Sequence, residues 1–234
     1  MEFKMIKENI LCVQENIKNA CERAGRDPKE VTLIAVSKTK PLSMIEEAYA
    51  AGMCEFGENK PQEMRDKAKL WEAPVHWHMI GTLQSNKIKY VVGTACMIHS
   101  VDSLALALAI EKEAAKKDLV MDILLEVNIA EEESKHGFSE EELLSVVEEV
   151  AALPHLKLRG LMTVAPYTEN AEKNRIYFRK MKELLVDINS KNIDNISMDS
   201  LSMGMSSDYE VAIEEGATMV RVGTGIFGER NYSH

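Results

Sequence analysis

The sequence predicts an α/β fold: a (β/α)8 barrel formed as a single domain by residues 1–234, with an extra helix at its N-terminus. Short apolar or β-branched runs alternate with segments whose apolar residues recur at helical spacing, which is typical of parallel strands joined by helices. There are eight such runs, and roughly 29 residues per unit suits a barrel of eight units better than an open doubly wound sheet. Residues 123–127 include apolar side chains on both faces of the expected strand, as a strand covered on both faces requires.

The elements follow in a regular order along the chain. An amphipathic helix is expected over 4–24, ended by Gly25. Capping boxes at Ser139 with Glu142 and at Ser207 with Glu210 begin two of the later helices. Strands are predicted at 31–37, 55–57, 75–81, 97–101, 122–128, 157–164, 196–203 and 219–227. Helices are predicted at 43–51, 60–70, 85–92, 104–117, 139–152, 170–189 and 207–215.

Composition excludes several classes of function. The formal net charge of −10 argues against broad contact with nucleic acid or an anionic membrane. The longest continuous apolar stretch, 104–110, is too short to span a bilayer, and the N-terminus lacks the apolar core of a signal peptide. The four cysteines show no CxxC spacing, which indicates buried or free thiols in a reducing compartment. We therefore expect a cytoplasmic monomer with no nucleic-acid or membrane partner.

Barrels of this class place their chemistry at the carboxyl ends of the strands. Lys38 directly follows the first apolar run, where partial burial would favour the neutral amine that forms imines with aldehydes. The alternative is a lysine that extends its ammonium from the strand end into solvent. Asn59 follows the second strand and suits a hydrogen bond to a ring substituent, although a turn residue is the alternative.

The last predicted strand ends in a glycine group. Gly223, Gly225 and Gly228 match the dinucleotide pattern GxGxxG, but only six residues follow, so no helix and ribose-binding acid are expected after it. Barrels instead bind phosphate in the loops after their seventh and eighth strands, where glycines expose backbone N–H groups. Thr224 adds a hydroxyl there, and Ser202 contributes from the neighbouring strand. The alternative is that these glycines only allow the barrel to close tightly.

Two further features involve side chains on strand faces. Arg221 shares a face with Gly223, and a guanidinium inside a barrel needs an acceptor from a carboxylate or a ligand. His76 and His78 have the spacing of a metal-ligand pair, so a metal-dependent hydrolase is one alternative. Because no other strand end offers a clear histidine ligand, we expect no metal. An amine on the first strand and a phosphate site on the last two instead suggest a phosphorylated aldehyde such as pyridoxal 5′-phosphate (PLP).

Several ordered motifs resemble those of a known family, the pyridoxal phosphate homeostasis proteins, which are single-domain relatives of the N-terminal barrel of alanine racemase. The resemblance extends from about residue 6 to residue 230. The motifs are IAVSKTKP at 34–41, FGEN at 56–59, WHMIG at 77–81, LQSNK at 83–87, LRGLM at 158–162, LSMGMS at 201–206 and VRVGTGIFG at 220–228.

The resemblance implies a role for each matched residue. Lys38 would be the Schiff-base lysine of PLP, and Asn59 would lie beside the cofactor ring. Arg221 would face the pyridine nitrogen. The phosphate would be bound by Ser202, Gly223 and Thr224. The family's function would be intracellular PLP homeostasis, by buffering the cofactor or delivering it to PLP-dependent apoenzymes.

The same resemblance argues against strong catalysis. Because a guanidinium only donates hydrogen bonds, the ring nitrogen beside Arg221 would be unprotonated and the ring a poorer electron sink. Racemisation also needs acid/base groups on both faces of the substrate carbon. In alanine racemase-like enzymes one of these is a tyrosine from a C-terminal domain, and we expect no second domain after residue 234. The expected protein is a binder with no or weak catalysis; the alternative is a small PLP-dependent amino-acid racemase.

Overall fold

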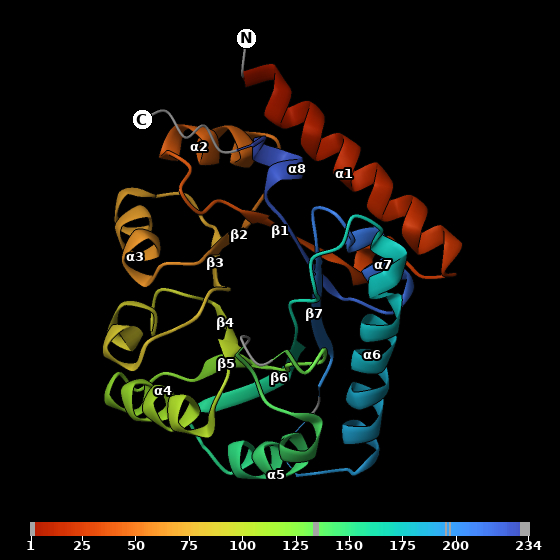
Figure 1. Ribbon diagram of the computed structural model, residues 1–234. Helices are drawn as coiled ribbons and strands as arrows, with labels where there is room; N and C mark the ends of the chain where they lie inside the picture. The colour runs from red at the N-terminus through yellow and green to blue at the C-terminus, as the bar shows by residue number, and fades with distance from the viewer. Residues whose placement is uncertain (1–2, 133–135, 195, 197, 230–234) are drawn as a thin grey trace.

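The computed structural model describes residues 3–132, 136–194, 196 and 198–229, and its centre is a closed barrel of eight parallel strands (Figure 1). The strands follow chain order around the barrel, and β8 pairs with β1 to close it. This confirms the predicted (β/α)8 barrel. The strands are β1 Thr32–Val36, β2 Glu55–Glu58, β3 His76–Met79, β4 Met97–Val101, β5 Met121–Glu126, β6 Leu156–Met162, β7 Ser200–Met205 and β8 Met219–Val222.

Helices surround the barrel, and the additional helix α1 (Phe3–Arg23) lies against its side near α7 and α8 (Figure 1). α1 buries Ile6, Ile10, Val13 and Ile17, which recur every three or four residues on one face. None of the described helices has both the length and the apolar composition needed to cross a bilayer. The others are α2 Leu42–Ala50, α3 Pro61–Leu70, α4 Leu104–Lys116, α5 Glu140–Ala151, α6 Arg175–Ser190, α7 Tyr209–Glu214 and α8 Thr224–Phe227, with 3-10 turns η1 Pro28–Glu30, η2 Ser85–Tyr90 and η3 Ala171–Asn174.

The end of the chain differs from the sequence-based expectation. β7 begins at Ser200 rather than at residue 196, and residue 197 of the predicted strand lies outside the described residues. β8 ends at Val222, because the glycine group turns into α8 instead of continuing the strand.

One of the two predicted capping boxes is confirmed. Ser139 caps α5, and the side chain of Glu142 accepts a hydrogen bond from the Ser139 backbone in return. The box at Ser207 is wrong, because the N-cap of α7 is Asp208. The Asp208 carboxylate accepts hydrogen bonds from the Met205 amide and the Asn174 side chain, which fixes the turn from β7 into α7.

The two ends of the barrel are here called the carboxyl mouth and the amino mouth, after the strand ends that form them. Between them the interior has an apolar part, the buried cluster of Met97, Leu124 and Met162. It also has a polar part, in which buried histidine, serine and arginine side chains from β3, β4, β7 and β8 contact one another. Both mouths are therefore in contact with the same polar interior.

Candidate functional site

Lys38 is the second residue after β1 and is half-buried at the carboxyl mouth. The next residue, Thr39, has a φ of 64°, a left-handed conformation that is uncommon for a β-branched residue. The Lys40 amide donates to the Ser37 carbonyl over 3.0 Å and closes a tight turn around Lys38. This backbone holds the lysine in a defined place at the strand end.

A buried ionic cluster beside this turn fixes the residues on both sides of Lys38. Lys67, from α3, donates to Glu58 Oε1 and to Glu63 Oε1 over 2.7 Å each. It also donates to the Ser37 carbonyl over 2.8 Å, and the Ser37 hydroxyl donates to Glu58 Oε1 over 2.6 Å. The Thr39 amide donates to Glu63 Oε1 over 2.6 Å.

This cluster concentrates charge in a largely buried position. The Glu58 side chain is fully buried and that of Lys67 is 10% exposed. Burial raises the pKa of the Glu58 carboxyl, although Lys67 and the Ser37 hydroxyl oppose the shift. Glu58 Oε2 has no hydrogen-bond partner among the described residues, so the carboxylate depends on Lys67 for its stabilisation. The pairing therefore ties α3 to the turn that carries Lys38.

Asn59 follows β2 directly and is half-buried at the same mouth. Gly81, after β3, lies so close that a Cβ atom added to it would be 2.6 Å from the Asn59 carbonyl oxygen. Only glycine permits this approach, which brings the loops after β2 and β3 together.

Arg221 lies inside the barrel and is 4% exposed. Its Nη1 donates to Ser202 Oγ over 2.5 Å, and its Nη2 donates to the Thr163 carbonyl over 2.8 Å. Within the described part of the chain no carboxylate forms a direct ion pair with it. Burial lowers the pKa of Arg221 to about 10, while Glu126 and Asp208 act in the opposite direction. A buried cation without a direct counter-ion favours an acceptor atom supplied by a ligand.

A chain of hydrogen bonds leads from Arg221 towards the amino mouth. Ser202 Oγ is 2.9 Å from His99 Nδ1, His99 Nε2 is 2.9 Å from His78 Nδ1, and His78 Nε2 is 2.7 Å from Glu55 Oε2. Burial holds the pKa of His99 well below its ordinary value, and the charges of His78 and Arg221 add to the shift, so His99 is neutral. Burial raises the pKa of Glu55, but hydrogen bonds from His78 and His76 outweigh it, so the net pKa is lowered.

The glycine group forms the rest of the carboxyl mouth. The amides of Gly223 and Gly225 donate to Ser206 Oγ over 3.1 and 3.4 Å, and Thr224 is exposed between them. Two backbone N–H groups directed at one oxygen can also hold an anion. Lys40 Nζ donates to the Phe227 carbonyl over 3.2 Å, which joins this segment to the turn after β1.

The structure thus brings Lys38, Asn59, Gly223 and Thr224 to one mouth, with Arg221 beneath them. Ser202 lies deeper, on Arg221, whereas Ser206 contacts the glycine amides. His78 lies in β3, but its ring faces Glu55 at the amino mouth and not the carboxyl mouth. Sequence reasoning also missed the ionic cluster, for which the i,i+4 pair of Glu63 and Lys67 was the available signal.

The family model of the alanine racemase N-terminal domain matches residues 10–231. A relative from Aquifex aeolicus named pyridoxal phosphate homeostasis protein is 47% identical over 226 residues, which cover 96% of this chain and 98% of that relative. The structure of PipY from Synechococcus elongatus with PLP bound matches with a TM-score of 0.84 and 34% identity, over 95% of this chain and all of that one. Alanine racemase from Corynebacterium glutamicum, 16% identical with a TM-score of 0.72 over 99% of this chain and 62% of that one, shares the fold. The chain therefore belongs to the alanine racemase N-terminal domain family and, within it, to the pyridoxal phosphate homeostasis proteins.

Proposed function

We propose that this protein binds PLP at the carboxyl mouth and holds it as a Schiff base on Lys38. The proposal rests mainly on Arg221. Its guanidinium is buried beneath the mouth that carries Lys38 and has no direct carboxylate partner in the described chain. Its N–H groups suit an acceptor such as an unprotonated ring nitrogen. A relative of 34% identity binds PLP on the same fold, which supports the choice of ligand.

The remaining residues take roles that fit their positions. Gly223 and Thr224 would bind the phosphate, together with Ser206, whose hydroxyl accepts from the glycine amides. Ser202 would complete the site by holding Arg221 in place. Asn59 would contact the ring from the loop after β2.

The bound cofactor would supply an aldehyde that condenses with an amine. Lys38 Nζ would hold this aldehyde as a Schiff base, with release of one water, so the link would be covalent but reversible by hydrolysis. Arg221 would donate a hydrogen bond to the ring nitrogen and leave that nitrogen unprotonated, which would weaken electron withdrawal by the ring and hence carbanion chemistry. We therefore propose storage or delivery of PLP by the chain as one domain, a monomer in the cytoplasm, with PLP-dependent apoenzymes as recipients.

The test is a spectroscopic titration of the purified protein with PLP. The wild-type protein should develop the absorbance band of a PLP imine with about one equivalent bound, and Lys38→Ala should not. The control is Lys60→Ala, which removes an exposed lysine next to Asn59 at the same mouth and should bind normally. Absence of uptake by the wild-type protein, or equal uptake by Lys38→Ala, would contradict the proposal.

A racemase is the enzymatic alternative, favoured by the fold shared with alanine racemase. It predicts deuterium exchange at Cα when the PLP-loaded protein is incubated with a single-enantiomer amino acid in heavy water. We expect no exchange above that of free PLP. Exchange that disappears in Lys38→Ala would establish the enzyme instead of the binder.

A further inference from the structure

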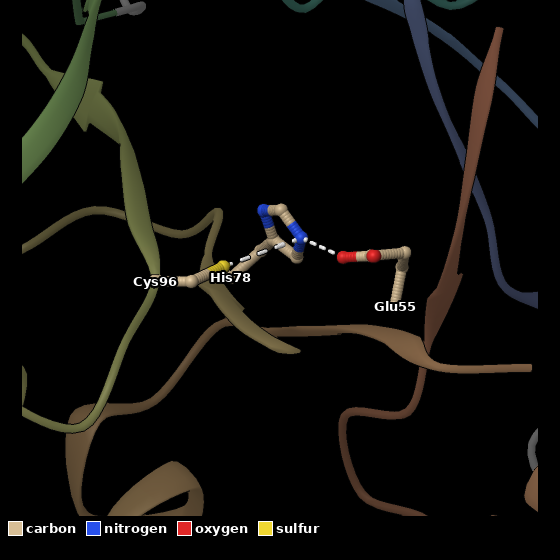
Figure 2. A group of neighbouring side chains, drawn as sticks. All are labelled: Glu55, His78 and Cys96. Carbon is tan, nitrogen blue, oxygen red and sulfur yellow. Dashed lines mark hydrogen bonds and ion pairs between the residues drawn. The ribbon is translucent and has the colours of Figure 1, made fainter. Parts of the chain in front are cut away.

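Three side chains meet at the amino mouth (Figure 2). This is the opposite end of the barrel from Lys38, which follows β1. Glu55 begins β2, His78 reaches down from β3, and Cys96 directly precedes β4. His78 Nε2 lies 2.7 Å from Glu55 Oε2 and 3.5 Å from Cys96 Sγ. Figure 2 shows the imidazole between the sulfur atom and the carboxylate.

We propose that Glu55, His78 and Cys96 form a binding site for a divalent cation of the zinc type. Thiolate, imidazole and carboxylate are the three ligand types that zinc takes in proteins. In a tetrahedral zinc site with bonds of about 2.0–2.3 Å the ligand atoms lie about 3.3–3.8 Å apart. The sulfur–nitrogen distance already has this value, and the nitrogen–oxygen distance must open by roughly 0.6 Å. The fourth position remains for water.

The ligands are already oriented by their neighbours, as metal ligands usually are. His78 is 4% exposed, and its Nδ1 is held by His99 over 2.9 Å. Glu55 Oε1 is held by His76 Nδ1 over 2.6 Å. Cys96 is exposed, so an ion can enter from solvent. Neighbouring histidines hold two of the ligands, and the third is reached from solvent. These two features distinguish the group from a simple histidine–carboxylate contact.

The hydrogen-bonded chain gives the site a connection to the barrel interior. The Glu55 carboxylate can only accept, so without metal and with both rings neutral each link of the chain donates towards Glu55. In that state His78 and His99 both carry their proton on Nε2, and the Ser202 hydroxyl donates to His99.

A cation on His78 Nε2 needs the lone pair of that atom and reverses this direction. Cys96 loses its thiol proton to solvent on binding, whereas the protons of His78 and His99 move to Nδ1 within each ring. His99 then donates to Ser202 Oγ, which accepts from Arg221 as well. Metal at the amino mouth thereby changes the hydrogen bonding of the arginine beneath the carboxyl mouth. This inference does not depend on PLP.

The first test uses Co²⁺ and Zn²⁺ on the full-length protein without PLP. Co²⁺ should bind at one equivalent with a thiolate-to-cobalt charge-transfer band, and Zn²⁺ should displace it. Cys96→Ser should lose the band, while Cys12→Ser and Cys54→Ser, which remove other exposed free thiols, should keep it. A wild-type protein without the band, or a band that survives in Cys96→Ser, would overturn the site.

The second test follows the ring protons by NMR of protein labelled with ¹⁵N-histidine. Zinc should move the protons of both His78 and His99 from Nε2 to Nδ1, and Glu55→Gln should weaken zinc binding at least tenfold. Zinc binding that leaves the His99 tautomer unchanged would overturn the connection to Arg221.

Discussion

The two mouths of the barrel are built in different ways. At the carboxyl mouth the side chains proposed to bind the cofactor stand mainly on loops, and Lys38 is held there by a buried ionic cluster and by Lys40, which reaches the segment after β8. At the amino mouth the polar residues stand on the strands themselves or next to them: Glu55 and His76 begin strands, and Cys96 precedes one.

The difference shows that side chains on loops and side chains on strands are held in place in different ways. Loops can approach a ligand from several directions, but they need support, which Lys67 and Glu58 supply at the carboxyl mouth. Strand residues are positioned by the sheet, and neighbouring side chains such as His99 and His76 then orient their polar atoms. The polar chain between Arg221 and Glu55 joins the two ends through His99.

The largest effect is expected from breaking the support of the carboxyl mouth. Lys67→Met leaves the buried Glu58 carboxylate without its cation, which should lower the free energy of unfolding by about 3–5 kcal/mol. The measurement is urea unfolding followed by circular dichroism. The double variant Glu58→Gln with Lys67→Met removes both charges and should recover much of the loss. A single variant as stable as the wild-type protein would show that the cluster does not support this mouth.

The next largest effect is expected on PLP binding, which should depend on the carboxyl mouth. Arg221→Gln removes charge-assisted hydrogen bonds and should weaken PLP retention by about 1.5–3 kcal/mol, or roughly ten- to hundredfold. The matched control is Arg159→Gln, since Arg159 pairs with Asp199 next to β7 and lies outside the proposed site. Equilibrium dialysis measures both. Equal PLP affinity in the wild-type protein and Arg221→Gln would remove Arg221 from the site.

Cutting the link between the mouths should have a smaller effect on stability. His99→Leu leaves Ser202 and His78 each without one partner, which should cost about 1–3 kcal/mol of unfolding free energy. It should also weaken zinc binding by about 10–100-fold, because His78 loses its orienting neighbour. Calorimetric titration with zinc measures this effect. The control is His155→Leu. His155 contacts Glu111 and is not part of the hydrogen-bonded chain from Arg221 to Glu55, so this variant should bind zinc as the wild-type protein does.

The smallest effect concerns a region away from both mouths. Hydrogen bonds from Arg179 and Arg175 lower the pKa of Glu215 below its ordinary value of about 4.5. Its carboxylate therefore stabilises the fold above pH 4.5, and this contribution is lost as the pH falls through the lower, folded-state pKa. Glu215→Gln should flatten the acid side of the stability profile slightly, whereas the exposed Glu148→Gln should not. Thermal unfolding between pH 3 and 7, in roughly half-unit steps, measures the slope.

The carboxyl mouth was more predictable from sequence than the amino mouth. Lys38 and Asn59 lie within two residues of the ends of their strands, so the barrel rule alone places them at one end. His78 and Cys96 are brought together only by the pairing of β3 with β4, and no spacing along the chain reveals that contact. Asp208 takes the N-cap position of α7 predicted for Ser207. Its carboxylate is bound by Asn174, 34 residues away, a contact that local sequence does not reveal.

We propose that the chemistry of this protein resides on Lys38 at the carboxyl mouth. The most direct measurement is borohydride reduction of the protein loaded with PLP, followed by peptide mapping with mass spectrometry. We expect one phosphopyridoxyl group per chain, on Lys38, with Lys40 and Lys60 unmodified. A label on another lysine, or labels spread over several, would contradict it.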